Sequence, residues 1–594
     1  MRTSIATVSL SGTLEEKLAA AAAAGFDGVE IFENDLVTSP WSPAELRRRT
    51  EDLGLAVELY QPFRDFEAVP PELFARNLRR AERKFDVMEQ LGAPMLLVCS
   101  SVHPAAVDDD GLAAAQLHAL AARAGRRGLR IAYEALAWGR HVSTYPHSWE
   151  IVRAADHPAL GVCLDSFHIL SHGSDPAGIG DVPAEKLFFL QLADAPRLAM
   201  DVLQWSRHHR CFPGQGGFDL AGFVAEVLAA GYTGPLSLEV FNDVLRQSDP
   251  ARTAVDAMRS LRVLGGALPN VVEPSGYSFT ELAVDAVSGP AMAEVLAAMG
   301  FAHAGQHRSK PVQLWEQGDA RLLLNFGDRR LSGLLHGDSL VTALGVETAD
   351  PAGAARRAES LLAPVLPRLR GPAEADLSAV AAPDGTSVFF CRTDGPTSWV
   401  DDFVPVAVPG PALVTGIDHV ALPQPFDHFD EAGLFYRAVL ALEPQESLEV
   451  PAPYGLVRSR PVAGGVRVVL NVSLLGTGGS TPSGPEPHHV AFATDDIVAA
   501  ARAMRAAGAP LLRITDNYYE DLSARTQLSD ETLAQMRELG VLYDADAGGE
   551  FFHFYTELIG SRAFFEVVQR AGGYAGYGAA NAPVRMAAQR PRGT

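Results

Sequence analysis

The most constraining feature of this sequence is a strand-then-helix alternation that recurs eight times within the first 265 residues. Short apolar runs bounded by breakers are typical of strands buried on both faces, as in a parallel sheet. The expected strands are Ser4–Val8, Gly28–Phe32, Leu55–Tyr60, Met95–Cys99, Arg130–Glu134, Gly161–Asp165, Leu187–Leu192 and Pro235–Val240. This pattern predicts a (β/α)8 barrel. An open doubly wound sheet is the competing fold, but no glycine-rich phosphate-binding motif follows the first strand.

The segments between these strands have helical patterns, and several carry explicit stop signals. Gly25, Gly54 and Gly92 stand just past the ends of apolar-periodic segments, where glycine commonly ends a helix. The expected helices are Thr13–Ala24, Pro43–Leu53, Glu72–Leu91, Leu112–Arg126, His147–Ala155, Leu220–Ala229 and Pro250–Leu264.

Polar side chains stand at the ends of the last four expected strands, namely Glu134, Asp165, Gln191 and Glu239. In a barrel these strand ends meet at one mouth. Three carboxylates crowded there would raise one another's pKa values and weaken the fold unless a cation neutralised them. Oxygen ligands fit Mg²⁺ or Mn²⁺, with Co²⁺ as a further candidate, better than zinc. Capping of a neighbouring helix is the alternative for any one carboxylate, and it explains all four positions together poorly.

Asp165 is followed three residues later by His168. An imidazole beside a metal-binding strand suits acid–base chemistry, because it titrates near neutrality. In the alternative interpretation Asp165 caps the next helix and His168 is an ordinary core residue.

Composition restricts the partners of this chain of 594 residues. Its net charge of −23 with no basic block argues against nucleic acid or an anionic membrane, and we expect a small-molecule substrate. The four cysteines form no C-x-x-C pair, and the N-terminus lacks a signal-peptide pattern. No apolar run reaches membrane-spanning length. These features predict a cytoplasmic protein, with a homo-oligomer left open.

The first half resembles the xylose isomerase-like group of sugar isomerases, epimerases and dehydratases. Asp165-x-x-His168 matches that group's sixth-strand motif. The segment Gln191-Leu192-Ala193-Asp194-Ala195 and the later segment from Ser206 to Gly214 are similar to the bacterial 3-dehydroshikimate dehydratases. Glutamine at 191, where sugar epimerases usually have histidine, favours the dehydratase branch.

The resemblance implies a hydro-lyase that converts 3-dehydroshikimate to 3,4-dihydroxybenzoate (protocatechuate) in quinate and shikimate catabolism. It implies a metal held by the four strand-end residues, His168 as acid–base residue with Glu134 and Glu239 as further candidate bases, and substrate binding by Arg210, Ser206 and Arg64. Two alternatives stay open. In the first, the barrel is a keto-sugar isomerase or epimerase. In the second, the protein is a dioxygenase or an aromatic-acid-binding protein that acts through its second half.

A glycine- and proline-containing break after residue 265 predicts a domain boundary. We expect a linker over 266–275, a degenerate copy of a repeat over 276–402, a metal-competent copy over 403–578, and a disordered tail over 579–594 that is rich in alanine, arginine and proline. Each copy contains a Leu-Asn pair and a closing Phe-Phe pair.

The two copies differ at three positions that matter for metal binding. The second copy has His419, His489 and Glu566, and we align these with Glu281, Ala343 and Cys391 of the first copy. Two imidazoles and a carboxylate converging from strands form the facial triad used for non-haem Fe²⁺. The alignment therefore predicts that only the second copy binds a metal.

The second half resembles 4-hydroxyphenylpyruvate dioxygenase and its vicinal-oxygen-chelate fold, an α+β architecture of two repeats. The segments 488–497, 516–522 and 548–556 carry the likeness. His553 stands where those dioxygenases usually have a substrate-contacting glutamine, and Val472 follows Asn471 in place of their Glu-Pro-Ala. The resemblance implies bound Fe²⁺ or Mg²⁺, while the departures predict that hydroxyphenylpyruvate is not oxidised.

Overall fold

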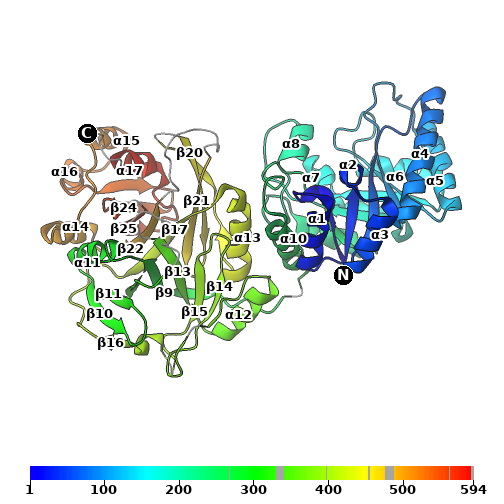
Figure 1. Cartoon of the computed structure of the whole chain (residues 1–594). Helices are drawn as coiled ribbons and strands as arrows, with labels where there is room; N and C mark the ends of the chain where they lie inside the picture. Colours follow the sequence, from blue (N-terminus) through cyan, green and yellow to red (C-terminus); the bar gives the residue numbers. More distant parts are fainter. Residues whose placement is uncertain are drawn as a thin grey trace. The chain divides into compact units, whose positions relative to one another are not determined.

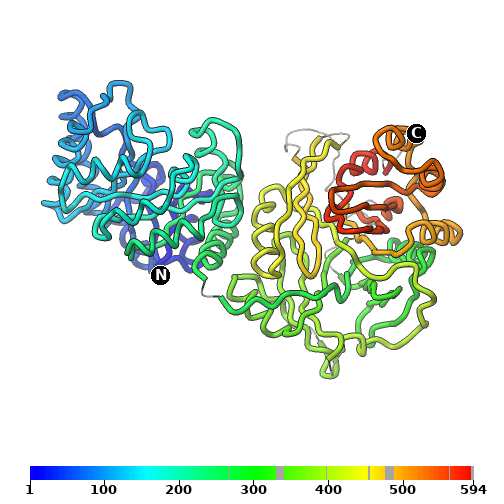
Figure 2. Tube along the Cα trace, turned by 180° about the vertical axis from the view of Figure 1, so that it is seen from behind, coloured from blue at the N-terminus to red at the C-terminus, as the bar shows by residue number. Residues whose placement is uncertain are grey.

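A computed structural model describes residues 1–266, 268–328, 340–368, 370–395, 398–452, 455–474, 487–560 and 562–589. The chain divides into two compact units, Met1–Ala267 and Leu268–Thr594, which Figures 1 and 2 show coloured along the sequence. Within these ranges, every helix is too short or too polar to cross a membrane.

The first unit is a closed barrel of eight parallel strands that pair in chain order, with the last strand returning to the first. The strands are β1 (Thr3–Ala6), β2 (Gly28–Phe32), β3 (Ala56–Phe63), β4 (Met95–Cys99), β5 (Arg130–Glu134), β6 (Leu160–Asp165), β7 (Leu187–Leu192) and β8 (Leu236–Leu238). The predicted (β/α)8 barrel is confirmed. Strands β4 to β7 are buried along nearly their whole length, which explains their unbroken apolar runs.

Helices surround this barrel in Figure 1. They are α1 (Leu14–Ala24), α2 (Glu33–Thr38), α3 (Pro43–Asp52), α4 (Pro71–Leu91), α5 (Asp110–Arg126), α6 (Tyr145–Ala155), α7 (Ser166–Ser171), α8 (Val202–His208), α9 (Leu220–Ala229) and α10 (Pro250–Gly265). Thr13 and Glu16 form a capping box at the start of α1. Gly25 and Gly92 end α1 and α4 with φ of 87° and 77°, the left-handed conformation that glycine tolerates best.

The sequence pattern missed the short helices α2, α7 and α8. They span six or seven residues each, which is too short to show a 3.6-residue periodicity. Two of them matter for function, because α7 carries His168 and α8 carries Ser206.

The second unit contains two mixed sheets with helices, which confirms the α+β expectation. The first sheet has the order β14-β15-β13-β9-β12-β11-β10-β16. Its strands are β9 (Pro274–Ala283), β10 (Ala302–His307), β11 (Val312–Gln317), β12 (Ala320–Asn325), β13 (Leu340–Thr348), β14 (Ser378–Ala381), β15 (Ser387–Cys391) and β16 (Phe403–Pro405), with helices α11 (Ser288–Ala298) and α12 (Pro351–Ser360). The expected boundary between residues 402 and 403 is wrong, because β16 pairs with β10 of this sheet.

The second sheet has the order β18-β20-β21-β17-β22-β25-β24-β23, and β19 pairs with β20. Its strands are β17 (Gly416–Pro423), β18 (Glu443–Pro444), β19 (Leu448–Ala452), β20 (Gly455–Ala463), β21 (Arg467–Ser473), β22 (His488–Ala493), β23 (Leu542–Ala545), β24 (Gly549–Tyr555) and β25 (Ala563–Gly572). Its helices are α13 (Phe429–Leu440), α14 (Ile497–Ala506), α15 (Asp516–Arg525), α16 (Asp530–Leu539) and α17 (Ala582–Ala588).

The expected disordered tail is wrong for residues 579–589. A short 3₁₀ turn leads into α17, and the red C-terminal segment packs against the second sheet in both views (Figures 1 and 2). Arg585 is buried, and its guanidinium lies 4.8 Å from the centre of the Phe564 ring. Alanine favours the helix and this cation–π contact holds it, two effects that composition alone does not reveal. Residues 590–594 lie outside the described part of the chain.

Strand pairing shows which positions of the two sheets correspond. In the first sheet Asn325 of β12 pairs with Ala283 of β9. In the second sheet Asn471 of β21 pairs with Pro423 of β17. Since each asparagine ends the same Leu-Asn pair, Ala283 and Pro423 occupy equivalent positions.

The equivalence extends from these anchors to the three metal-candidate positions. Phe279 lies four residues before Ala283, as His419 lies four residues before Pro423. Glu281 of β9 lies two residues after Phe279 and pairs with Ala343. Ala421 of β17 lies two residues after His419 and pairs with His489. Gly345 of β13 lies two residues after Ala343 and pairs with Phe389. Ala491 of β22 lies two residues after His489 and pairs with Glu566. The equivalent pairs are therefore His419 with Phe279, His489 with Ala343, and Glu566 with Phe389.

Two of the three sequence alignments are thus wrong, because Glu281 and Cys391 each lie two residues beyond the true counterpart. A shift of two residues keeps a side chain on the same face of a strand. The alternation of apolar and polar residues along a strand therefore cannot reveal this error. Only the inter-strand register corrects it.

The three counterpart positions in the first sheet form an apolar plug, defined here as Phe279, Ala343 and Phe389. The rings of Phe279 and Phe389 are 5.8 Å apart, and Phe279 also lies edge-on to Trp399 at 4.9 Å. Ala343 is fully buried in the same core cluster. The first copy therefore builds hydrophobic core where the second copy places polar side chains.

We expect Phe279→Ala to destabilise the second unit by about 3–5 kcal/mol, because it removes a buried ring and leaves a cavity. Thermal and denaturant unfolding of the full chain measure this. Phe426→Ala is the matched control, because Phe426 is 52% exposed, and it should change stability by less than about 0.5 kcal/mol. Equal effects of the two substitutions would contradict the plug as a core element.

Candidate functional site

The carboxylate of Asp165 is divided between two tasks. Its Oδ1 accepts hydrogen bonds from the backbone N–H groups of Phe167 and His168, at 2.6 and 3.2 Å, and so caps α7. Its Oδ2 accepts a hydrogen bond from Arg210 Nη1 at 2.8 Å. The capping interpretation is therefore confirmed for Oδ1, while Oδ2 faces the barrel mouth through Arg210 and the functional role of Asp165 stays a prediction.

Glu134, Asp165 and His168 form a compact buried cluster at the barrel mouth. Each offers one ligand atom, and these atoms all lie within 4.8 Å of one another. Glu239 joins the group through Arg210, whose Nη1 lies 2.8 Å from Asp165 and 3.2 Å from Glu239. Three of the four predicted strand-end residues thus converge, together with the predicted histidine.

The fourth strand-end residue, Gln191, is the register partner of Asp165 on the neighbouring strand. Its Nε2 donates a hydrogen bond to Glu30 Oε2 at 2.6 Å, and its Oε1 accepts a weak hydrogen bond from the Cys163 thiol at 3.5 Å. Gln191 therefore lies in the same layer of the barrel, with its amide nitrogen held by Glu30.

Burial and mutual repulsion set the protonation behaviour of the cluster. The pKa of Glu134 is raised well above its usual value by burial and by the charges of Asp165 and Glu239. Burial raises the pKa of Glu239 to about 7 against the opposing effect of Arg210. Burial acts to raise the pKa of Asp165, but the charge of Arg210 and the hydrogen bonds from Arg210 and the His168 backbone N–H contribute to a net lowering of that pKa. Burial lowers the pKa of His168 to about 3, so the imidazole is neutral.

The residues present suit a divalent cation. Among the described residues, Glu134 Oε1 is buried and has no hydrogen-bond partner, although a carboxylate oxygen in such a place normally has one. The carboxylates of Glu134, Asp165 and Glu239 face one another, and the amide of Gln191 lies beside them. This oxygen-rich donor set fits Mg²⁺ or Mn²⁺.

A small pocket opens over this cluster. It is lined by Gln61, Pro62, Arg64, Leu97, Cys99, Glu134, Leu136, Trp138, His168, Ser206, Arg207, Arg210, Glu239 and Phe241. All three residues expected to bind substrate, Arg64, Ser206 and Arg210, therefore face one space. Arg210 is fully buried and donates from Nη2 to Ser206 at 2.8 Å. Arg64 is half-buried and makes no hydrogen bond or ion pair to any described residue.

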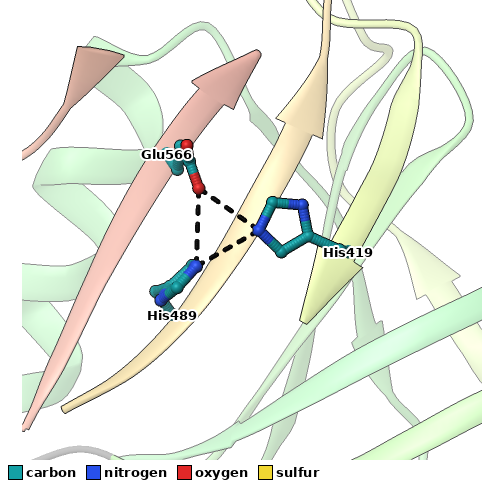
Figure 3. A group of neighbouring side chains, drawn as sticks. All are labelled: His419, His489 and Glu566. Carbon is teal, nitrogen blue, oxygen red and sulfur yellow. Dashed lines mark hydrogen bonds and ion pairs between the residues drawn. The ribbon is translucent and has the colours of Figure 1, made fainter. Parts of the chain in front are cut away.

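A second candidate metal centre lies in the second unit, where three strands of one sheet bring His419, His489 and Glu566 together. Figure 3 shows the three side chains pointing toward a common point. The two imidazole Nε2 atoms are 3.3 Å apart, and Glu566 Oε2 lies 3.3 Å from His419 and 3.4 Å from His489. This arrangement is that of a two-histidine, one-carboxylate metal site.

Hydrogen bonds behind these three residues fix their orientations. His419 Nδ1 lies 2.8 Å from Asp418, which Arg570 holds through two hydrogen bonds of 2.8 and 2.9 Å. Glu566 Oε1 lies 2.7 Å from His553 Nδ1, so that only Oε2 faces the two imidazoles. Such partners fix the orientation of metal-binding side chains. Burial raises the pKa of Glu566, but the hydrogen bonds from the three histidines outweigh it and lower that pKa well below its usual value.

Comparison with known proteins follows the same division of the chain. A sequence model of the xylose isomerase-like TIM barrel matches residues 18–263, and a model of the N-terminal part of hydroxyphenylpyruvate dioxygenase matches residues 269–400. A solved structure described as a xylose isomerase-like TIM barrel/4-hydroxyphenylpyruvate dioxygenase fusion protein covers 99% of each chain, with a TM-score of 0.91 and 46% identity. The 3-dehydroshikimate dehydratases of Pseudomonas putida and Pseudomonas aeruginosa are 48% and 49% identical, and each alignment covers 99% of this chain and 98% of the relative.

The chain belongs to the 3-dehydroshikimate dehydratase family. It is therefore an enzyme of the hydro-lyase class, as the sequence motifs predicted. The family resemblance of the second half to hydroxyphenylpyruvate dioxygenase is confirmed as well.

Sequence reasoning missed three polar residues that shape these sites. Glu30 lies in the middle of β2 as a lone carboxylate within an apolar strand, a signal that was available in the sequence. Asp194 is a buried carboxylate two residues after β7. Asn581, which contacts His553 Nε2 at 2.8 Å, lies in the segment expected to be disordered.

Asp194 joins the segment after β7 to the loop around Cys211. The two residues pair backbone to backbone, with N–H to O distances of 2.9 and 2.8 Å. The Asp194 carboxylate also accepts four backbone N–H bonds of 2.8–3.0 Å, from Ala195, Gly214, Gly216 and Phe218. This clamp fixes the loop that carries Arg210 into the cavity.

We expect Asp194→Asn to lower stability by about 2–3 kcal/mol, because an amide cannot accept all four of these bonds. The same change should reduce dehydratase activity, since the loop that holds Arg210 loosens. Thermal unfolding and turnover measure the two effects. Asp201→Asn is the matched control, because that carboxylate caps only the exposed end of α8 and should leave activity unchanged. An Asp194→Asn enzyme with full stability would contradict the clamp.

Proposed function

We propose that the barrel dehydrates 3-dehydroshikimate to 3,4-dihydroxybenzoate (protocatechuate) and water, with a divalent metal held by Glu134, Asp165, Gln191 and Glu239. The observation that carries the proposal is the buried, unpartnered Glu134 Oε1 among converging carboxylates. The names of the two Pseudomonas relatives supply the substrate. The place of this reaction would be quinate and shikimate catabolism.

A bound divalent ion would act as a Lewis acid toward the negative charge that develops on the ring ketone oxygen when the neighbouring C–H proton is removed. Mg²⁺ and Mn²⁺ are our first candidates, followed by Co²⁺. The remaining chemistry falls to the side chains around the cavity.

Glu134 is the proposed base, because its Oε1 makes no hydrogen bond to any residue that the structure describes and is available to take the proton. Glu239 is the less suitable candidate, because its Oε2 accepts a hydrogen bond from Arg210 at 3.2 Å. Loss of the distal hydroxyl then completes the dehydration, and aromatisation of the ring makes the overall reaction favourable.

His168 is proposed to hydrogen-bond to the departing hydroxyl, which leaves as water with the proton that Glu134 has taken from carbon. Its Nδ1 accepts a hydrogen bond from the Ala137 backbone N–H at 3.2 Å, so the neutral ring carries its proton on Nε2. Arg210 Nη2, a second donor, lies 3.3 Å from that Nε2. Two adjacent donors call for an acceptor that both can reach, and a hydroxyl oxygen of the substrate in the cavity meets that need.

Arg64 is proposed as the partner of the substrate carboxylate, in preference to Arg210. The guanidinium of Arg210 is already committed to Asp165, Glu239 and Ser206. Arg64 lines the same cavity with no such commitment within the described residues, so its charge is available to an anionic ligand.

We expect Glu134→Gln and Asp165→Asn to lower dehydration at least about 1,000-fold, because each removes a cation-binding oxygen and the first also removes the base. The rise in ultraviolet absorbance on aromatisation measures turnover. A chelator should abolish the activity of the unaltered enzyme, and Mn²⁺ should restore it.

His489→Ala is the control for that experiment, because it alters only the second unit and should retain dehydration. A ketose offered in place of 3-dehydroshikimate should give no reaction. Activity that survives both carboxylate substitutions and chelation would overturn the proposal.

We further propose that His419, His489 and Glu566 bind a divalent metal, Fe²⁺ or Mg²⁺, in the second unit. The observation that favours this is the convergence of their three ligand atoms within 3.4 Å (Figure 3). His553, bonded to Glu566 and Asn581, occupies the place where the similar dioxygenases have a substrate-contacting glutamine.

The second unit should therefore bind metal without oxidising 4-hydroxyphenylpyruvate. With Fe²⁺ and this substrate, an oxygen electrode should record no uptake above background. Metal analysis of His419→Ala should show about one equivalent less than the unaltered chain. Oxygen uptake comparable with that of a true dioxygenase would contradict the first expectation, and unchanged metal content the second.

A further inference from the structure

Glu30 is a buried carboxylate that links four strands below the cavity. Its Oε2 accepts hydrogen bonds from Gln61 Nε2 at 2.8 Å and from Gln191 Nε2 at 2.6 Å, and its Oε1 accepts one from the Ser237 hydroxyl. These partners come from β3, β7 and β8, while Glu30 lies on β2. All four side chains are essentially inaccessible to solvent.

The partners of Glu30 are neutral, so its charge is not matched by a cation within this network. Burial and then the nearby charge of Glu239 raise the pKa of Glu30 well above its usual value. Removing a carboxylate from water without an opposite charge is costly. A chain that needed only core packing at this position could use an apolar residue, which points to a task for the carboxylate itself.

That task follows from the chemistry of the Gln191 amide. Its two ends, a donor NH₂ and an acceptor oxygen, are nearly equal in size and can exchange places by rotation. Glu30 Oε2 accepts a hydrogen bond from the NH₂ group of Gln191 as well as from that of Gln61, so it holds the NH₂ end of the Gln191 amide. The oxygen end is then fixed on the opposite side, where the weak Cys163 thiol donor lies at 3.5 Å and is its one hydrogen-bond partner among the described residues.

We propose that Glu30 is a positioning residue for the barrel metal, which orients Gln191 so that its carbonyl oxygen, rather than its NH₂ group, faces the cation. This inference rests on the metal site proposed above. It also accounts for a glutamine at a ligand position, since an amide ligates a cation only through oxygen.

The inference is tested by binding of Mn²⁺ to the full chain, measured by titration calorimetry. All proteins carry His489→Ala, which removes the second candidate site. Glu30→Gln should weaken Mn²⁺ binding about 10- to 100-fold, because residue 30 then also offers a donor and Gln191 can invert. Gln191→Ala should weaken binding as well. In the double variant, Glu30→Gln should add nothing to the effect of Gln191→Ala.

This double-mutant cycle distinguishes an effect of Glu30 on the orientation of the Gln191 amide from the simple loss of a negative charge. An electrostatic role would weaken binding equally with and without Gln191, and that result, or no weakening at all, would overturn the inference. If Glu30→Gln does not fold, Glu30→Asp replaces it in the same cycle. Aspartate keeps the carboxylate but draws its oxygen away from the Gln191 amide. Glu67→Gln is the matched control, because Glu67 is a buried carboxylate of the same barrel that bonds Ser101 and Tyr133 instead. It should leave Mn²⁺ affinity unchanged.

Failure of the metal site itself gives a different result. If the His489→Ala chain with Glu30 and Gln191 intact binds no Mn²⁺, the proposed metal site is overturned. If that chain binds Mn²⁺ and the Glu30 variants bind it equally well, only the role of Glu30 is overturned.

Discussion

The barrel site depends on a buried guanidinium held between two carboxylates. Arg210 joins Asp165 to Glu239, and all three side chains are almost completely buried. Removing one member of such a group typically costs about 3–5 kcal/mol, because a charge is left without its partner in a medium of low polarity. The position of Arg210 is therefore fixed as firmly as that of a core residue. Its backbone is bound on both sides, to Phe241 and to Asn242.

The same constraint explains how the barrel tolerates a further buried carboxylate near this group, that of Glu30. Arg210 lies beside Asp165 and Glu239, whereas Glu30 relies on two amides and a hydroxyl. The carboxylates of Asp165 and Glu239 are thus stabilised by an opposite charge, whereas that of Glu30 is stabilised by neutral hydrogen-bond donors. This separation leaves Glu134 as the carboxylate with an unpartnered oxygen in the described part of the cavity wall, which makes it the member best suited to chemistry.

Most of this arrangement was predictable from the sequence, because strand ends in a parallel barrel meet at one mouth. Glu134, Asp165 and Glu239 were placed together on that ground alone, and His168 followed from its spacing to Asp165. Glu30 was not found, because its role depends on the direction of side chains from three other strands, which no local pattern records. The tail was misjudged for a related reason. The contacts of Asn581 and Arg585 reach strands that are close in space but distant in sequence.

The repeat in the second unit shows a different limit of sequence reasoning. His489 was matched to the correct counterpart, Ala343, while the matches for His419 and Glu566 were off by two residues. Since side chains alternate across a strand, an error of two residues changes neither the face nor the burial pattern. The corrected register strengthens the interpretation of the two copies. Where one copy presents two imidazoles and a carboxylate, the other fills the same positions with Phe279, Ala343 and Phe389, side chains that cannot bind a metal.

Asp165 shows why a structural and a functional interpretation of one residue need not compete. Because Oδ1 is committed to the first turn of α7, the carboxylate cannot rotate, and Oδ2 is held toward Arg210. The cap also places His168, three residues later, so that its ring lies beside the same oxygen. An uncapped aspartate at this strand end could present either oxygen in many directions, and the helix that carries the imidazole would have no fixed start. The local rule that begins a helix is therefore the same interaction that aligns the His168 ring with the carboxylate at the end of β6.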